Sequence, residues 1–129
     1  MDDHLSREMY KEHILDLNKH PHNFGKIEAG KSHRSHNPLC GDDITMYIVE
    51  DNARVVDVKF SGRACSICMA SASLITDKIK GMPIKEIMKL NKEDVLSLLQ
   101  IPVSAVRLKC ALLPLESIHQ TLGENNDAA

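Results

Sequence analysis

The chain has few aromatic residues and no long apolar run, and each shortage excludes a class of protein. Aromatic residues make up 3% of its 129 residues and tryptophan is absent, so there is little on which nucleic-acid bases could stack. The net charge of -2 gives no electrostatic attraction to a phosphate backbone. No apolar run reaches the roughly 18 residues that a membrane-spanning helix needs. We therefore expect a protein that binds neither nucleic acid nor membrane.

The length and the N-terminal sequence narrow the class further. A chain of 129 residues is enough for one domain, and we expect one over residues 1–129, with frayed tails at 1–4 and 124–129. The first residues are polar and acidic, unlike a secretory signal, so a cytoplasmic location is expected. In that compartment cysteines more often bind metal or react than form disulfides. The four cysteines are therefore the natural place to look for chemistry.

Alternating apolar residues predict a small antiparallel sheet. One strand pattern places Ile44, Met46 and Ile48 on one face, and a second does the same with Val56, Val58 and Phe60. The linking Asp51-Asn52 tolerates a tight turn, so the two strands are expected to form a hairpin. A weaker pattern over 31–36 indicates a short edge strand. Together these patterns predict an α+β fold with about three strands and helices packed on one face.

Helical patterns fill most of the remaining sequence. The expected helix ends are set by chain breaks and by one cap. The breaks are at His20-Pro21 and at Gly81 and Pro83, and Asn91 with Asp94 forms the cap. The predicted helices cover residues 6–20, 66–80, 84–88, 93–99 and 102 to about 122. Pro114 lies inside the last of them and deprives the Cys110 carbonyl of its helical partner. We expect this helix either to bend there or to break and restart.

Three cysteines have settings that favour chemistry. Cys65 lies where a strand gives way to a helix, and the positive end of the helix dipole favours its thiolate form. Cys40 immediately precedes the first hairpin strand, so antiparallel pairing should bring it close to Cys65. Asp42, two residues after Cys40, can reach the same centre. Cys110 lies beside the cations of Arg107-Leu-Lys, which favour thiolate, although its pattern fits the core equally well.

Other readings of these residues stay open. Three thiolates and one carboxylate suit tetrahedral zinc, or iron with sulfide. Cys68 falls on an apolar helical stripe and is expected to pack in the core, yet Cys65-x-x-Cys68 could form a dithiol redox pair. His33 and His36 are near Cys40 in the sequence and could be spare ligands, although solvated loop positions are the expectation for both.

Taken together, these motifs resemble the iron–sulfur cluster scaffold family that includes IscU, SufU and the N-terminal domain of NifU. The resemblance covers nearly the whole chain. It is carried by Tyr10-Lys-Glu-His-Ile-Leu-Asp, His20-Pro-His-Asn-Phe-Gly, Asn37-Pro-Leu-Cys-Gly-Asp, Arg63-Ala-Cys-Ser-Ile-Cys-Met-Ala-Ser-Ala-Ser and Arg107-Leu-Lys-Cys-Ala-Leu-Leu. Three separate cysteine motifs in the right order make chance agreement very improbable.

The resemblance implies a SufE/IscU-like fold and a function. It implies that Cys40, Asp42, Cys65 and Cys110 hold a nascent [2Fe–2S] cluster, or iron, at one end of the sheet. It implies that a cysteine desulfurase supplies the sulfur and that recipient apo iron–sulfur proteins take the cluster. The weak oxygen ligand Asp42 would ease release of the cluster. A monomer or weak homo-oligomer is expected.

Two branches of the family differ in ways that leave a second function open. Lys109 stands where IscU-like members carry histidine, and Val103-Ser-Ala-Val-Arg replaces their chaperone motif, as in SufU. SufU-like members bind zinc and relay persulfide sulfur, but usually carry an insertion for which the span from Met82 to Arg107 leaves no room. The scaffold, which is not an enzyme, is preferred over the zinc-dependent sulfurtransferase. In a relay, Cys40 is the expected sulfur acceptor, with Cys110 as the alternative.

Overall fold

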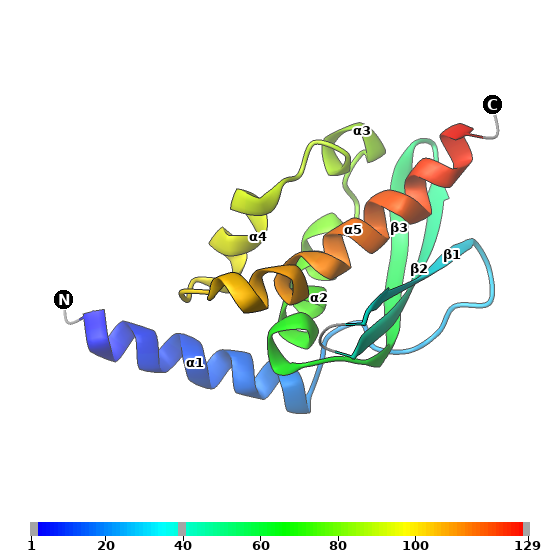
Figure 1. The fold of residues 1–129 in the computed structure, drawn as a ribbon. Coiled ribbons are helices and arrows are strands. Elements are labelled where there is room, and N and C mark those ends of the chain that lie inside the picture. Colours follow the sequence, from blue (N-terminus) through cyan, green and yellow to red (C-terminus); the bar gives the residue numbers. More distant parts are fainter. Residues whose placement is uncertain (1–2, 39–40, 128–129) are drawn as a thin grey trace.

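The structure, a computed structural model, describes residues 3–38 and 41–127, with side chains described from 11 to 123 within these ranges. Figure 1 shows helices packed against the strands, with α1 extending away from them toward the N-terminus. The elements, in chain order, are α1 (Asp3–Lys19), β1 (Lys31–Asn37), β2 (Asp42–Asp51), β3 (Arg54–Arg63), α2 (Ser66–Ile79), α3 (Ile84–Ile87), α4 (Lys92–Leu99) and α5 (Ala105–Asp127).

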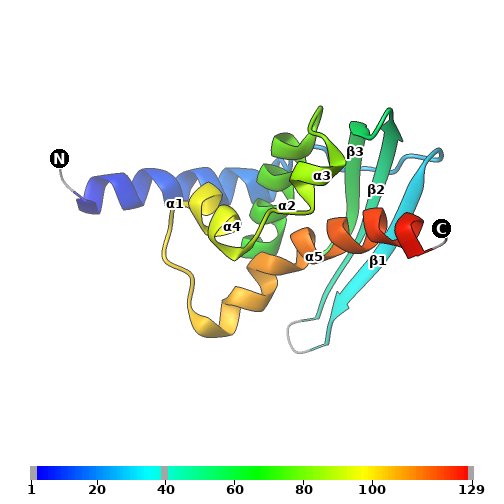
Figure 2. The ribbon, with the colours of Figure 1, turned by 90° about the horizontal axis from the view of Figure 1, so that it is seen from above.

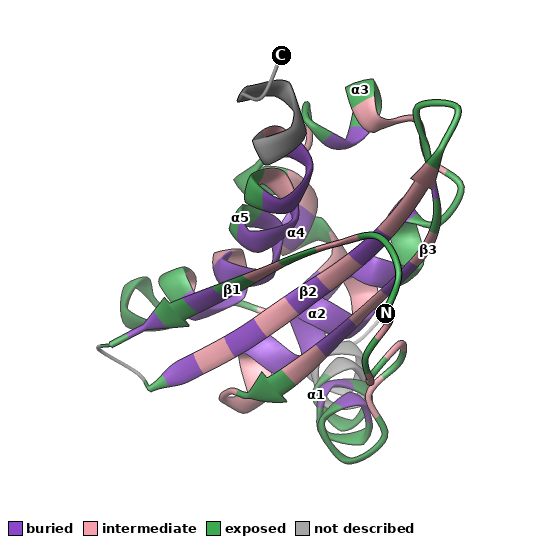
Figure 3. Cartoon of the chain, turned by 90° about the vertical axis from the view of Figure 1, so that its right-hand side faces the viewer, coloured by how far each residue is buried: buried purple, intermediate pink, exposed green. Residues whose placement is uncertain are grey.

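The three strands form one antiparallel sheet in the order β1-β2-β3. Ile44, Met46 and Ile48 of β2 are fully buried. Figure 3 shows the buried positions alternating along this strand, with α2 behind the sheet and α5 beside β1. A strand with one apolar face needs a single covering layer. The predicted α+β fold, with a three-stranded sheet and helices on one face, is therefore confirmed, and so is the edge strand β1.

A bulge in β3 makes one strand prediction wrong. Val49 pairs with Asp57 and the next residue, Glu50, pairs with Val55, so Val56 is an extra residue in the ladder. The side chain of Val56 is consequently 56% exposed, and Val55 takes the buried position. A bulge shifts the alternation of faces by one residue, and strict alternation along the sequence could not reveal it.

The helix boundaries follow from local caps. Asn91 accepts a hydrogen bond from the Asp94 N–H and donates its own N–H to the Asp94 carboxylate, which confirms the predicted cap of α4. The last helix begins later than predicted: Pro102 precedes it and α5 starts at Ala105. The Arg107 N–H bonds to the hydroxyl of Ser104, so a serine cap, rather than the proline, begins this helix.

Pro114 lies inside α5 without interrupting it. The helix is continuous from Ala105 to Asp127, so the prediction that it breaks and restarts is wrong, and it extends beyond the expected end near Leu122. Figure 2 shows that its first turns lie at an angle to the rest. Pro114 is buried, and Ser71 of α2 donates a hydrogen bond of 2.6 Å to the Ala111 carbonyl in the same stretch. This bond ties α5 to α2 three residues before the proline.

The segment after α1 is fastened to α2 by polar contacts. Asn23 donates to the Thr76 hydroxyl at 2.9 Å and to the Asp77 carboxylate at 2.8 Å. The ring nitrogen Nδ1 of His22 lies 2.6 Å from the other oxygen of Asp77, and the backbone N–H of His22 donates to the Ser73 hydroxyl. These bonds hold α2, whose first residue follows Cys65, in a fixed place beside the sheet. Within the described residues, no helix has the length and apolarity to cross a membrane.

Candidate metal centre

Asp42 lies at the end of the sheet where β2 begins. The turn before it is closed by the Gly41 N–H, which donates to the Asn37 carbonyl at 2.8 Å. Gly41 has φ +73, a left-handed conformation that glycine adopts without strain. Asp42 is only 1% exposed, so its carboxylate is directed into the protein.

The adjacent aspartate has a different environment because successive strand residues face opposite sides of the sheet. Asp43 lies on the outer side, where the Arg34 guanidinium donates to both of its oxygens at 2.8 and 2.5 Å. This hydrogen bonding is the main reason that the pKa of Asp43 is held below its usual value. Asp43 is therefore engaged by Arg34, and Asp42 alone of the two faces the cysteines. The sequence analysis missed this ion pair.

Cys65 is joined to Asp42 through its backbone. The Cys65 N–H donates to Asp42 Oδ1 at 2.8 Å, and Cys65 Sγ lies 4.0 Å from Asp42 Oδ2. Cys65 is the residue that precedes the first turn of α2, and its side chain makes no capping hydrogen bond. The thiol is half-buried and lies at the positive end of the helix dipole.

Cys110 approaches the same point from α5. Its side chain is fully buried. One ligand atom from each of Asp42, Cys65 and Cys110 lies within 4.8 Å of the other two. On a tetrahedral zinc ion with bonds of about 2.0 to 2.3 Å, ligand atoms are about 3.3 to 3.8 Å apart. The three donors, all within 4.8 Å of one another, exceed this spacing by at most about 1.5 Å. One donor comes from β2, one from the start of α2 and one from α5.

The other sequence candidates fall elsewhere. Cys40 lies outside the described residues. Cys68 is fully buried in the apolar core cluster, which agrees with its predicted packing role. Neither His33 nor His36 belongs to a group of metal-binding side chains in the part of the chain that is described. The described donor set is therefore one carboxylate and two thiols.

The fold and the donor set define the class of protein. It is a small α+β protein in which one end of the sheet and two helices bring thiol and carboxylate ligands together. The model of the NifU-like N terminal domain family matches residues 9–127. The chain therefore belongs to that family, and the resemblance read from its motifs is confirmed.

Relatives support the same membership. The chain is 39% identical over 84 residues to the zinc-dependent sulfurtransferase SufU of Bacillus subtilis, covering 65% of this chain and 57% of that protein. It is 31% identical over 121 residues to the iron-sulfur cluster assembly enzyme IscU of Drosophila melanogaster, covering 90% and 77%. The chain thus spans less than two thirds of the Bacillus relative.

A solved structure has the same arrangement of elements. A putative iron-sulfur cluster assembly scaffold protein for the SUF system from Fervidobacterium islandicum superimposes with a TM-score of 0.76 at 31% identity. The match covers 91% of this chain and 98% of that one. A nitrogen-fixing NifU-like protein from Brucella abortus, at 17% identity and a TM-score of 0.74, shares the fold.

Proposed function

We propose that the chain is an iron–sulfur cluster assembly scaffold. In this proposal Cys40, Asp42, Cys65 and Cys110 hold a nascent [2Fe–2S] cluster as cargo, a cysteine desulfurase supplies its sulfur, and apo iron–sulfur proteins receive it. The observation that carries the proposal is the convergence of Asp42, Cys65 and Cys110 within 4.8 Å. Thiolates are the usual ligands of iron–sulfur clusters, and the described donors, two thiols and one carboxylate, come together from β2, the start of α2 and α5.

The two oxygens of Asp42 have different tasks in this proposal. Oδ1 accepts the Cys65 N–H, which fixes the plane of the carboxylate. Oδ2, which lies 4.0 Å from Cys65 Sγ, is then left to bind the metal. Carboxylate is a harder and weaker ligand for a cluster than thiolate, so the bond to Oδ2 is the one expected to open first during delivery.

Charge around the site supports the thiolate form. Arg107 and Lys109 are exposed neighbours of Cys110 along α5, and Arg63 precedes Cys65 by two residues. Three thiolates and a carboxylate would bring four negative charges, which these cations and the start of α2 partly offset.

A second function, zinc-dependent sulfur transfer, is favoured by Lys109 and by the similarity to a protein named as a zinc-dependent sulfurtransferase. The donors suit resident zinc, which the same residues would hold. A thiolate of this chain would attack the outer sulfur of the desulfurase persulfide, and the desulfurase cysteine would leave as thiolate. Cys40 remains the predicted acceptor, with Cys110 as the alternative. Trapping of the persulfide by alkylation tests this, and label found on Cys65 alone would overturn the assignment.

Anaerobic purification decides between the two functions. Iron and acid-labile sulfide in equal amounts, with visible absorption bands, are expected for the scaffold. Delivery is then measured by mixing the loaded chain with an apo-ferredoxin and following the absorption of the recipient. A tightly held zinc ion that neither iron nor sulfide displaces would instead support the sulfurtransferase and end the scaffold proposal.

A further inference from the structure

A buried hydroxyl joins the two helices that lie next to the cysteine ligands. Ser71 of α2 is 2% exposed, and its Oγ donates a hydrogen bond of 2.6 Å to the carbonyl oxygen of Ala111 in α5. The helix α2 begins immediately after Cys65, and Ala111 immediately follows Cys110. The bond therefore connects the two helical segments that carry the described thiol ligands, which lie side by side in Figure 2.

This bond differs from those of other buried hydroxyls in the same helices. In a helix, a serine or threonine hydroxyl often donates to the carbonyl four residues earlier in its own chain segment. Three buried hydroxyls follow that pattern, those of Ser73, Thr76 and Thr121. Ser71 instead donates to a carbonyl 40 residues away in the sequence. A bond between two helices constrains how they lie relative to each other, whereas a bond within one helix does not.

The acceptor lies in a part of α5 that has less helical bonding of its own. Pro114 is inside the helix and has no N–H, so it gives no helical hydrogen bond to the carbonyl of Cys110. The backbone at Cys110 is therefore held less firmly by its own helix than the backbone of an uninterrupted turn. The hydrogen bond from Ser71 to the adjacent carbonyl, that of Ala111, constrains this turn from outside the helix.

The spacing of the three described donors depends on two links between elements. One is the Cys65 N–H, which donates to Asp42 at 2.8 Å and joins the start of α2 to β2. The third donor, Cys110, has to be held relative to that pair. The bond between Ser71 and Ala111 joins α2 to α5 within one residue of Cys110, so it is placed to set this remaining distance.

We propose that Ser71 is a positioning residue of the metal centre. Its hydrogen bond to Ala111 holds Cys110 at the distance from Cys65 and Asp42 at which all three can bind one metal ion. Ser71 itself is not a ligand, and its effect reaches the metal through Cys110. The inference rests on the proposed function, because it requires these side chains to share an ion.

The zinc affinity of the full chain, measured by competition with a chromogenic chelator, tests this role. Ser71→Ala should weaken zinc binding by about tenfold, the lower end of the loss found when a group that orients a metal ligand is removed. Alanine adds no atoms and favours a helix, so the variant should remain folded. Thr121→Val is the matched control because Thr121 is also fully buried but bonds within α5. It should lower the thermal stability and leave the zinc affinity unchanged.

A double-mutant cycle separates positioning from a general loss of structure. Because Ser71 acts through Cys110, Ser71→Ala should have no further effect on zinc affinity in a chain that already carries Cys110→Ala. The cobalt-loaded chain gives a spectroscopic readout of the same point. Ser71→Ala should lose part of the thiolate-to-cobalt absorption, as Cys110→Ala does, while Thr121→Val should keep it.

Two results would overturn the role of Ser71 alone. One is a zinc affinity and cobalt spectrum of Ser71→Ala that match wild type. The other is an equal weakening of zinc binding by Ser71→Ala with and without Cys110, which a merely structural role would produce. A folded wild-type chain that binds neither zinc nor cobalt would instead overturn the shared metal centre, and with it the proposed function.

Discussion

The Cys65 N–H donates a 2.8 Å hydrogen bond to Asp42 Oδ1, which joins the first residue of β2 to the residue that precedes α2. This bond makes Asp42 both a candidate ligand and a brace for Cys65. A buried carboxylate that is 1% exposed is costly unless hydrogen-bonded, and the Cys65 amide supplies such a bond. The two roles can be separated by substitution.

Asp42→Ala removes both roles, whereas Asp42→Asn keeps an oxygen that can accept the Cys65 N–H. Both variants should hold a reconstituted cluster longer than wild type, because the weak oxygen ligand is lost. Asp42→Ala should also lower the free energy of unfolding by about 1–3 kcal/mol, since it leaves a buried N–H without its acceptor. Cluster lifetime by absorption and stability by urea unfolding measure the two effects. A cluster as labile as that of wild type would contradict the ligand role.

Cys68→Ser separates metal binding from dithiol redox chemistry. Cys68 is fully buried in the apolar core, so a serine hydroxyl there should lower stability by about 1–3 kcal/mol. Metal content after reconstitution should match wild type. A disulfide-reductase activity that disappears with this substitution would instead support the redox pair.

Gly62 allows β2 and β3 to approach closely beside the site. It has φ +125, and a Cβ there would lie 2.1 Å from the Asp43 carbonyl oxygen. Gly62→Ala should therefore destabilise the chain by more than about 1 kcal/mol and reduce metal loading. Gly123→Ala is the matched control: a Cβ there meets no atom within 4 Å, and a helical alanine should stabilise by about 1 kcal/mol. Thermal unfolding of both variants measures the two changes in stability, which should be opposite in sign.

Asp77 gives the stability a dependence on pH. Burial raises the pKa of Asp77, but hydrogen bonds from His22 and Asn23 outweigh it, and the pKa lies below its ordinary value of 3.8. A folded-state pKa below the unfolded one stabilises the protein above the unfolded value, and this stabilisation is lost as pH falls through the folded value. Asp77→Asn should be less stable than wild type at pH near 7 and should approach it below about pH 3.

Urea unfolding at both pH values measures this, with exposed Asp16→Asn of α1 as the control. A deficit in Asp77→Asn that is equally large in acid would show that the carboxylate charge does not contribute.

The sequence predicted those features that depend on local patterns. Alternation identified the buried face of β2, and Asn91 with Asp94 identified the start of α4, because both signals act over a few residues. The neighbouring residues of Cys65 and Cys110 also indicated that these two thiols are candidate ligands. The pairing of Asp42 with Cys65 was expected only in outline, from the antiparallel hairpin.

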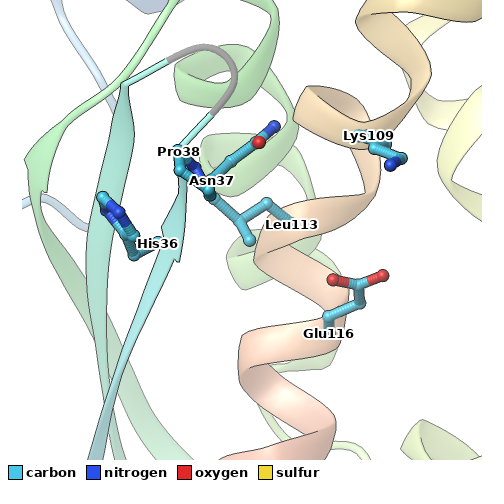
Figure 4. A pocket seen from close by; sticks show the side chains of 6 residues that line it. All are labelled: His36, Asn37, Pro38, Lys109, Leu113 and Glu116. Carbon is cyan, nitrogen blue, oxygen red and sulfur yellow. The ribbon is translucent and has the colours of Figure 1, made fainter.

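Features that depend on contacts between distant segments were not predictable. The bulge at Val56 depends on how β2 and β3 pair, and the bond from Arg34 to Asp43 depends on the register of β1. A pocket between the end of β1 and α5 is lined by both Asn37 and Leu113, which are far apart in the sequence (Figure 4). Such relationships arise from packing, and single-sequence patterns do not encode them directly.

X-ray absorption at the zinc edge tests the convergence of ligands most directly, because zinc serves as a spectroscopic probe in either function. The zinc-loaded wild type should show three sulfur ligands at about 2.3 Å and one lighter atom at about 2.0 Å. Cys65→Ala and Cys110→Ala should each lose one sulfur, and Cys68→Ala should lose none. An unchanged number of sulfur ligands in Cys65→Ala or Cys110→Ala would contradict a single metal centre built from Asp42, Cys65 and Cys110.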